Sequence, residues 1–439
     1  MDINKIKMLI RQEINAGRMG EDVKKIIAKG VRFAGTENEK RAAKYVEEQF
    51  RLAGLQVKVD KISGINAWNH IDTRVKIVEP VERELFGVAI LGSGSTPPEG
   101  ITAEVVYTGR GRTEDCEGLN IENKLVFRDP PRALTLDNAS DKTSPQGPTE
   151  MLINRKVAGF IEYSRVKGNI LQVDLLSGPK GLPVPAVSLT YEDGQVLKEL
   201  LQEWYAIPTW YKRTQDHIPV KLNIVVDSKS EPSYGTNVIA SIPGTKKPNE
   251  KVVLVAHHDN AFGPGACDNA TAVAVNLECA RILAKLPAPK RTIEFVSVTG
   301  EEYGEFGSNA FVEKYVKPNP KNYKGALVLD IIGNGDHLYY ITESICLGKL
   351  VKNSIDINNL IEKVCDNLGY VVEGTPLEFA SDDGPFIMAG VETSYLAKLI
   401  SSSWPWLHTD MDDYKVVDIN GLKVVAEISA LTIWNVANN

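Results

Sequence analysis

The sequence predicts an α/β protein in which a mostly parallel mixed sheet, flanked by helices, is interrupted by a β-rich insert. From residue 229 onward, continuous apolar runs of strand length alternate with helical patterns, which is typical of a sheet covered on both faces. Between residues 85 and 228, short β-like runs are instead separated by turns rich in Gly, Pro and Asp. We therefore assign residues 1–84 and 229–439 to one α/β domain and residues 85–228 to the insert.

The elements follow in chain order. Residues 37–54 carry apolar side chains on one side and charges on the other, and this helical pattern ends at Gly54. The run 55–62 then alternates like a strand. The insert contains one helical pattern, at residues 191–204. Its short β-like runs lie at residues 87–91, 103–109, 124–129, 158–164, 185–190 and 220–226.

The second part of the α/β domain has longer elements. Continuous apolar strands are expected at 251–256, 292–298 and 326–332, and helices at 269–286 and 420–437. A chain of 439 residues with 43% hydrophobic residues can bury cores of this size.

Composition narrows the classes of function. The net charge of −7 argues against a broad nucleic-acid-binding surface, which needs clustered basic side chains. No apolar run approaches the ~20 residues that span a bilayer. The N-terminus lacks the apolar core of a signal peptide, and five cysteines without a C-x-x-C pair favour reduced thiols. We therefore expect a cytoplasmic protein without nucleic-acid or membrane partners; its oligomeric state is not readable from the sequence.

Side chains that can bind metals or move protons follow successive buried strands. They are His257 and Asp259 after the first strand, Glu301 and Glu302 after the second, and Asp330 at the end of the third. Two more candidates are Asp268, which is expected to open the long helix after the Gly263–Gly265 turn, and His408 near the C-terminus. An acidic pair or a lone histidine is by itself more often a surface or structural feature. In open α/β sheets, however, residues beyond the carboxyl ends of the strands meet in one cleft. The convergence of these residues therefore favours a functional site.

Five motifs in this order resemble the co-catalytic zinc aminopeptidase family, which includes bacterial leucyl aminopeptidases, glutamate carboxypeptidase and, more distantly, glutaminyl cyclase. The motifs are HHDNAFGPGACDNATAVA, TGEEYGEFGSNAFV, LDIIG, SDDGPFIMAGV and HTDMDD. The resemblance implies a zinc-exopeptidase fold of the phosphorylase/hydrolase-like kind. The insert is similar to the protease-associated domain of many members.

The resemblance also implies the ligands of two metal ions. His257 and Asp330 would hold one ion, Glu302 and His408 the other, and Asp268 would bridge both. Imidazole and carboxylate ligands suit Zn²⁺, and also Co²⁺ or Mn²⁺.

Two further roles follow from the same resemblance. Glu301 would be the general base that deprotonates the attacking water and then protonates the leaving amine. Asp259 would hydrogen-bond the far nitrogen of His257 and fix its tautomer. The peptide bond Asp268–Asn269 is expected to be cis.

Three positions depart from the family pattern. Cys267 stands where many relatives have Asp, and His258 occupies a variable position; both are expected to be bystanders. Asp383 stands where His is frequent, which affects the expected substrate contacts. Trp404 and Trp406 either form the wall of an apolar pocket or pack structurally.

The leading hypothesis is a metal-dependent exopeptidase that removes N-terminal residues from peptide substrates. The alternatives are a glutaminyl-peptide cyclotransferase-like acyltransferase and an inactive receptor or scaffold relative. Cyclases, however, carry an acid where this chain has Ser381, and the chain has all five ligands of a two-metal site. A glutamate-releasing carboxypeptidase would carry a further helical domain, whereas this chain ends soon after His408.

Overall fold

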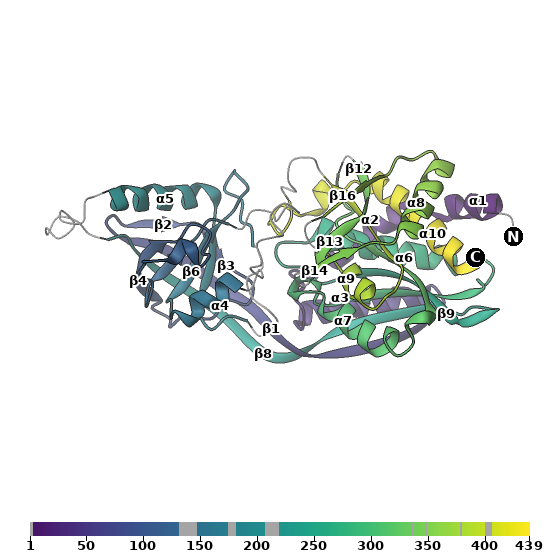
Figure 1. Cartoon of the computed structure of the whole chain (residues 1–439), viewed down its shortest axis with the longest axis horizontal. Helices are drawn as coiled ribbons and strands as arrows, with labels where there is room; N and C mark the ends of the chain where they lie inside the picture. Colours follow the sequence, from purple (N-terminus) through teal and green to yellow (C-terminus); the bar gives the residue numbers. More distant parts are fainter. Residues whose placement is uncertain are drawn as a thin grey trace.

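The computed structural model consists of two lobes joined by a pair of long strands (Figure 1). It describes residues 3–130, 147–173, 181–206, 219–335, 337–346, 349–377, 380–399 and 406–439. The joining strands are β1 (Gln56–Glu79) and β8 (Lys221–Ile242), which pair antiparallel along their whole length. One lobe contains the described residues between these two strands, together with the end of β1 and the start of β8. We call it the inserted lobe. The rest is the α/β lobe.

The sheet of the α/β lobe is mixed with a parallel centre. Its order is β15 (Glu373–Thr375), β12 (His337–Ile341), β16 (Thr393–Leu399), β11 (Tyr323–Leu329), β9 (Lys247–His257), β10 (Arg291–Val298), β8 and then β1. The four strands from β16 to β10 are parallel, whereas β8 and β12 are antiparallel to their neighbours β10 and β16. A separate hairpin pairs β13 (Glu343–Cys346) with β14 (Lys349–Lys352). The predicted fold class is confirmed.

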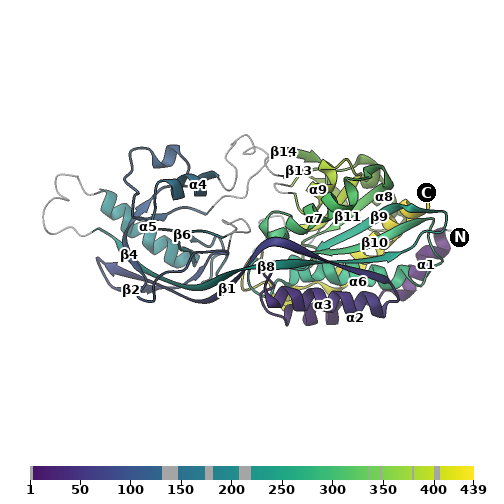
Figure 2. The same ribbon diagram turned by 90° about the horizontal axis from the view of Figure 1, so that it is seen from below.

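The central strands are apolar throughout because both of their faces are covered. Along β9, Val252 and Leu254 point into one core while Val253 and Val255 point into the other. The first core lies under α1 (Ile3–Glu13), α2 (Ala16–Ile27), α3 (Glu37–Leu52), α6 (Thr271–Leu283), α8 (Ile355–Leu368) and α10 (Ile419–Asn438). The second lies under α7 (Phe306–Phe311) and α9 (Asp383–Met388). Figure 2 shows α2, α3 and α6 on one side of the sheet and α7 and α9 on the other.

Three of the four predicted helices have both ends within two residues of the predicted bounds, whereas the helix predicted over 269–286 spans Thr271–Leu283. The helix predicted over 269–286 begins at Thr271, because Asp268 and Asn269 have non-helical dihedral angles. The expectation that Asp268 opens this helix is therefore wrong. Its N–H instead donates to the carboxylate of Asp412 at 3.0 Å. The Asp268–Asn269 peptide bond is cis, as expected.

The cysteines and the apolar character of the helices can also be examined in the structure. All five cysteines are buried and free of disulfides. Among the helices of the described ranges, none combines the length and the apolar character that crossing a membrane requires.

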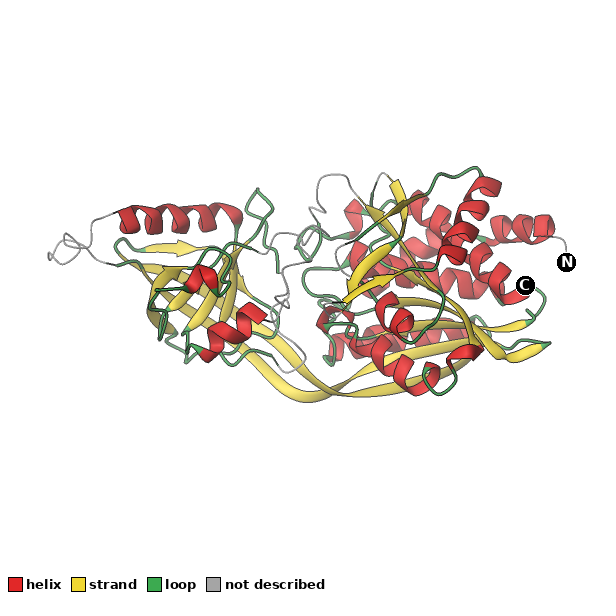
Figure 3. Cartoon of the chain, in the orientation of Figure 1, coloured by secondary structure: helices red, strands yellow, loops and turns green. Residues whose placement is uncertain are grey.

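Besides the short 3-10 helix Glu114–Cys116, the inserted lobe carries short strands and two α-helices within the described residues; Figure 3 shows their arrangement. They are β2 (Arg83–Leu85), β3 (Gly87–Ala89), β4 (Ile101–Tyr107), β5 (Leu125–Phe127), α4 (Gly147–Asn154), β6 (Gly159–Tyr163), β7 (Ala186–Leu189) and α5 (Tyr191–Ala206). The strands from β4 to β7 are parallel, and β4 pairs antiparallel with β8, so the sheet continues from one lobe into the other. The predicted division at residues 85 and 228, and the protease-associated assignment, stay predictions.

The half-buried carboxylate of Asp129 connects three elements of the inserted lobe. Asp129 accepts hydrogen bonds from the hydroxyls of Tyr107 and Tyr163 at 2.6 and 2.7 Å, and from Lys198 of α5 at 2.7 Å. Burial alone would raise the pKa of Asp129, but these three donors outweigh it and hold the pKa below its ordinary value. Asp129 therefore stabilises the lobe as a carboxylate.

We expect Asp129→Asn to change how the stability of the inserted lobe depends on pH. A depressed pKa gives stability that is present above the ordinary pKa of the carboxyl and is lost as pH falls through the folded-state value. In the wild type, protection of α5 amides from hydrogen exchange should fall between pH 7 and pH 3. The variant should be less stable at pH 7 by about 1 kcal/mol and change less over this range. Asp72→Asn, at an exposed ion pair on β1, is the control; an equal pH response in all three proteins would contradict the role of Asp129.

Candidate active site

The ends of three neighbouring parallel strands place the first site residues together. His257 is the last residue of β9, Glu301 and Glu302 follow β10 in a short turn, and Asp330 directly follows β11. Because β9 lies between β10 and β11, these side chains meet at one edge of the sheet. The predicted convergence at the carboxyl ends of the strands is thus present in the structure.

His257 lies between two carboxylates. Its Nε2 is 3.2 Å from Asp330 Oδ1 and 3.4 Å from Asp268 Oδ1. It is also 4.0 Å from Glu301 Oε2. All of these side chains are mostly buried.

His408 lies between the other oxygen of the same aspartate and a different glutamate. Its Nε2 is 3.3 Å from Asp268 Oδ2 and 3.1 Å from Glu302 Oε2. The two oxygens of Asp268 therefore face the two histidines, one each. This is the arrangement expected of a carboxylate that bridges two ions.

The donor atoms fit two metal ions. His257, Asp268 and Asp330 form one group in which every ligand atom lies within 4.8 Å of the others, and Asp268, Glu302 and His408 form another. Ligands bound tetrahedrally at ~2.0–2.2 Å to one Zn²⁺ lie ~3.3–3.6 Å apart, which agrees with the distances between these atoms. The five predicted ligands thus come together in the two expected sets.

The buried cluster carries more carboxylates than basic side chains, which favours the binding of cations. Burial alone would lower the pKa of His257, but the charges of Asp330 and Glu301 outweigh it and raise that pKa well above its ordinary value. Burial, opposed by His257 and reinforced by Asp330 and Glu302, raises the pKa of Glu301 well above its usual range. Within the described residues, the ion-pair partners of the four clustered carboxylates are the two histidines. Bound divalent cations would neutralise this buried surplus of negative charge.

Asp259 contacts both His257 and the backbone of the two glutamates. The far nitrogen of His257, Nδ1, lies 3.3 Å from the backbone carbonyl of Asp259 and 3.6 Å from its carboxylate. That carboxylate also accepts from the backbone N–H groups of Glu301 and Glu302 at 3.3 and 3.4 Å. Asp259 therefore positions both glutamates, and its predicted role in fixing the His257 tautomer stays a prediction.

Two of the candidate ligands, Glu302 and Asp330, each accept a hydrogen bond at the oxygen that does not face a histidine. Ala261 N–H donates to Glu302 Oε1 at 2.9 Å, and the Ser381 hydroxyl donates to Asp330 Oδ2 at 2.7 Å. In each case one oxygen is held while the other faces a histidine. Such outer partners fix the direction in which a ligand presents its lone pairs.

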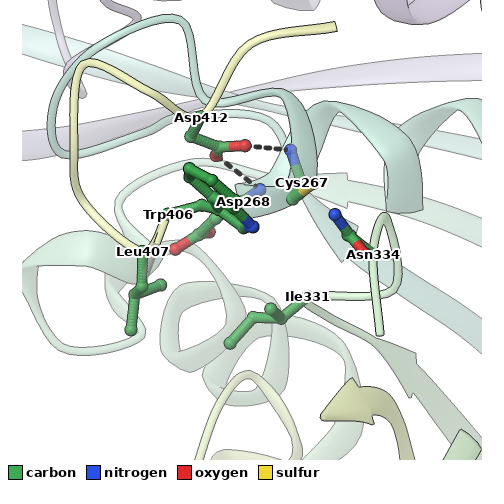
Figure 4. Close-up of a pocket in the computed structure, with 7 residues that line it drawn as sticks. All are labelled: Cys267, Asp268, Ile331, Asn334, Trp406, Leu407 and Asp412. Atoms are coloured by element: carbon green, nitrogen blue, oxygen red, sulfur yellow. Dashed lines mark hydrogen bonds between the residues drawn. The ribbon is translucent and has the colours of Figure 1, made fainter. Parts of the chain in front are cut away.

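Asp412, which the sequence analysis did not single out, holds the backbone of Cys267 and Asp268. Its carboxylate accepts from the backbone N–H of Cys267 at 2.7 Å and of Asp268 at 3.0 Å (Figure 4). The side chain is 1% exposed, and burial raises its pKa to about 7. The segment 406–412 thus supplies both the ligand His408 and the support of the bridge.

Arg32 is a second residue that the sequence did not reveal. It is fully buried, and its guanidinium donates to the carbonyls of His258 at 2.9 Å, Pro264 at 2.7 Å and Gly265 at 2.9 Å. Burial lowers its pKa to about 10. Arg32 therefore ties down the loop that connects His257 to Asp268.

The two expected bystanders lie outside the ligand groups. His258 is buried between Ser297 Oγ at 2.9 Å and Glu39 Oε1 at 3.0 Å, so both its nitrogens are engaged away from the cluster. The Cys267 side chain is buried, and burial raises the pKa of its thiol well above the ordinary value.

Further acids surround the cluster. Asp382 is fully buried, and neither of its carboxylate oxygens has a hydrogen-bond donor at bonding geometry among the described residues, although Ser308 lies beside it. Burial raises the pKa of Asp382 to about 7 and that of Asp383 to about 6. Burial and these two acids raise the pKa of Glu305 to about 8. The surroundings of the cluster are therefore acidic.

Two site residues have unusual backbone conformations. Ile331, next to Asp330, has φ of 51°, and His408 has φ of 53°. Residues other than glycine adopt this left-handed region rarely, and a β-branched residue especially so. Such conformations persist where the surroundings fix them, which is common at functional sites.

A small pocket lies against the bridging aspartate. Trp406, Leu407, Ile331 and Asn334 surround Asp268 there (Figure 4). Trp406 is thus one wall of a partly apolar pocket, which favours that reading of this residue. Trp404, its predicted companion, lies outside the described residues.

Comparisons with known proteins agree with this geometry. Residues 237–433 match the model of peptidase family M28. The chain is 27% identical to carboxypeptidase Q of Bos taurus, over 93% of this chain and 83% of that protein. It is 24% identical to aminopeptidase YwaD of Bacillus subtilis (strain 168), over 92% and 81%. The structure of BSAP, a zinc aminopeptidase from Bacillus subtilis, matches with a TM-score of 0.74 at 20% identity, covering 97% of this chain and 96% of that one, so the fold is shared.

Proposed function

Since residues 237–433 match the model of peptidase family M28, we propose that the protein is a dizinc exopeptidase that removes amino-terminal residues from peptides. His257 and Asp330 would hold one ion, Glu302 and His408 would hold the other, and Asp268 would be shared between the two. The observation that supports this most directly is the pair of donor groups that share Asp268. The same donors suit Co²⁺ or Mn²⁺.

The protein side chains divide the work of hydrolysis. When bound, the two ions polarise the peptide carbonyl and make the attacking water more acidic. Glu301 receives a proton from that water at its carboxylate and delivers it to the amine that leaves. Its backbone N–H is held by Asp259 at 3.3 Å, which keeps the carboxylate beside His257.

The acidic surroundings support recognition of an amino terminus. Asp382 is buried with both oxygens free of donors at bonding geometry among the described residues, and Glu305 and Asp383 lie in its field. Arg32, whose charge acts on Asp268 and Glu302, is committed to three backbone carbonyls. In its ionised form Asp382 attracts a substrate ammonium group and repels a terminal carboxylate.

The carboxypeptidase alternative rests on the similarity to carboxypeptidase Q. The two activities are separated with one peptide sequence in four forms, with the amino terminus free or acetylated and the carboxyl terminus free or amidated. We expect release of the first residue from both forms with a free amino terminus, and loss of activity after zinc is removed with a chelator. Cleavage that requires a free carboxyl terminus would contradict the proposal.

The two remaining alternatives have distinct outcomes in the same assay. Formation of pyroglutamate from a peptide that begins with Gln, without release of a free amino acid, would indicate the cyclase-like reaction. Absence of tightly bound zinc together with absence of turnover would indicate the receptor or scaffold alternative. The complete ligand set, with Ser381 bonded to Asp330 rather than an acid at that position, supports the hydrolase.

A further inference from the structure

The loop that carries His408 is anchored on two sides. At its carboxyl end, Asp412 bonds the backbone of Cys267 and Asp268 in the α/β lobe. At its amino end, the carbonyls of Leu407 and His408 accept hydrogen bonds from the inserted lobe, and from no other group among the described residues. Gln172 Nε2 donates to Leu407 O at 3.0 Å, and Val173 N–H donates to His408 O at 2.9 Å.

These contacts form a short strand-like junction. Gln172 pairs with Thr409 in an isolated antiparallel bridge. Gln172 is 4% exposed and Val173 is 1% exposed, so the junction is shielded from water. Both polar atoms of the Gln172 carboxamide make hydrogen bonds: Nε2 donates to Leu407 O, and Oε1 accepts from Arg165 N–H at 3.1 Å.

The junction is rooted in the body of the inserted lobe. Glu192, in the first turn of α5, accepts from the backbone N–H groups of Gly168 and Asn169 at 2.8 and 2.9 Å. These residues lie just before Gln172 on the same loop. Hydrogen bonds from α5 to Gly168 and Asn169, followed by the chain from Asn169 to Val173, therefore connect α5 to the backbone of His408.

His408 has a particular need of such an anchor. Its φ of 53° lies in the left-handed region, which its surroundings must impose. On the opposite side, Gly263 packs so closely that a Cβ there would lie 2.2 Å from the carbonyl oxygen of Thr409. The loop is thus held between Gly263 and the junction, and loss of either support lets the imidazole move.

We propose that Gln172 is a positioning residue for His408, and that the inserted lobe thereby sets the affinity of the metal position formed by Glu302, Asp268 and His408. This rests on the proposed dizinc site. The position formed by His257 and Asp330 is held mainly by β9 and β11, and Asp268 is the ligand that it shares with the other position. The inserted lobe therefore helps to build one metal position, because it holds the loop that carries His408.

The test measures zinc retained per chain during dialysis against increasing chelator, for the full-length protein. Gln172→Met keeps the approximate length of the side chain and removes both of its hydrogen bonds, to Leu407 O and from Arg165 N–H. We expect one of the two zinc ions to be lost at about 10-fold lower free chelator, within the range usual for partners that orient a ligand, and the other to be retained as in the wild type. Retention of both ions as in the wild type would overturn the proposal.

Two controls separate positioning from general damage. Asn223→Leu removes a side-chain amide that bonds only within the inserted lobe, to Glu99 O and Thr102 Oγ1; it should leave zinc retention unchanged. An equal loss of zinc in this variant would overturn the specific role of Gln172. A wild-type chain that binds no zinc would instead contradict the dizinc site itself.

A double-variant comparison locates the weakened ion. In a His408→Ala background, which removes a ligand of the affected position, adding Gln172→Met should leave the remaining zinc unchanged. In an Asp330→Asn background, which weakens the other position, the same addition should lower retention about 10-fold. The reverse pattern would place the effect at the other ion and overturn the proposal.

Discussion

Replacing Glu301 by Gln is expected to lower kcat by about 10³-fold while both zinc ions remain bound. General acid–base catalysis by one side chain contributes roughly 10²–10⁴-fold, and glutamine can neither accept nor deliver the proton. The amide has nearly the same shape, so KM should change little, which identifies an interaction made in the transition state. Steady-state kinetics on an aminoacyl substrate and zinc analysis of the same sample measure both quantities.

The zinc measurement is essential because Glu301 also belongs to a third group of potential ligand atoms, with His257 and Glu302. If Glu301 were a ligand, its replacement would release metal together with activity. Glu294→Gln is a matched control, since Glu294 is a buried glutamate on β10, the strand that leads to Glu301, and pairs with Lys251 at 2.6 Å. Activity near the wild-type level in zinc-loaded Glu301→Gln would exclude the general-base role.

Three of the five candidate ligands could be predicted because the sequence marks them twice, by their position after a strand and by their motif. His257, Glu302 and Asp330 each follow a continuous apolar run, and such runs are central strands whose carboxyl ends meet. Asp268 and His408 lack this positional signal and were found through their motifs. The cis bond at Asp268 came from the same resemblance.

The residues that hold the ligands could not be predicted, since their partners are backbone atoms far away in the sequence. Gln172 bonds a carbonyl 235 residues away, and Asp412 bonds an N–H 145 residues away. No side-chain pattern marks a backbone partner, because every residue offers the same N–H and C=O groups. The hydrogen bonds that the Asp259 carboxylate accepts from Glu301 and Glu302 were missed for the same reason, since their donors are also backbone N–H groups.

Arg32→Met is expected to destabilise the metal-free protein by about 3–5 kcal/mol, the largest effect on folding among these substitutions. The guanidinium is fully buried and bonds the carbonyls of His258, Pro264 and Gly265. Methionine fills part of the volume but leaves these buried acceptors without donors, each at a cost of about 1–3 kcal/mol. Urea unfolding followed by circular dichroism measures the loss.

The effect of Arg32 on zinc binding has two opposed causes. Its positive charge disfavours nearby cations, so removal of the charge alone would strengthen zinc binding. Its hydrogen bonds fix the loop between His257 and Asp268, so their removal would weaken zinc binding by roughly 10–100-fold, as for other groups that orient ligands. We expect the second effect to dominate, because interactions between charges inside a protein are reduced by a high effective dielectric constant of about 20.

Arg32→Lys separates the two causes. Lysine keeps the charge but is a single ammonium on a shorter reach, which cannot bond three divergent carbonyls at once. If positioning dominates, the lysine and methionine variants should both lose zinc affinity; if charge dominates, the lysine variant should match the wild type and the methionine variant should bind more tightly. Arg281→Met, which removes a buried pair with Asp22 away from the site, should cost stability without changing zinc affinity. A wild-type zinc affinity in both Arg32 variants would show that the His258–Gly265 loop keeps its shape without this guanidinium.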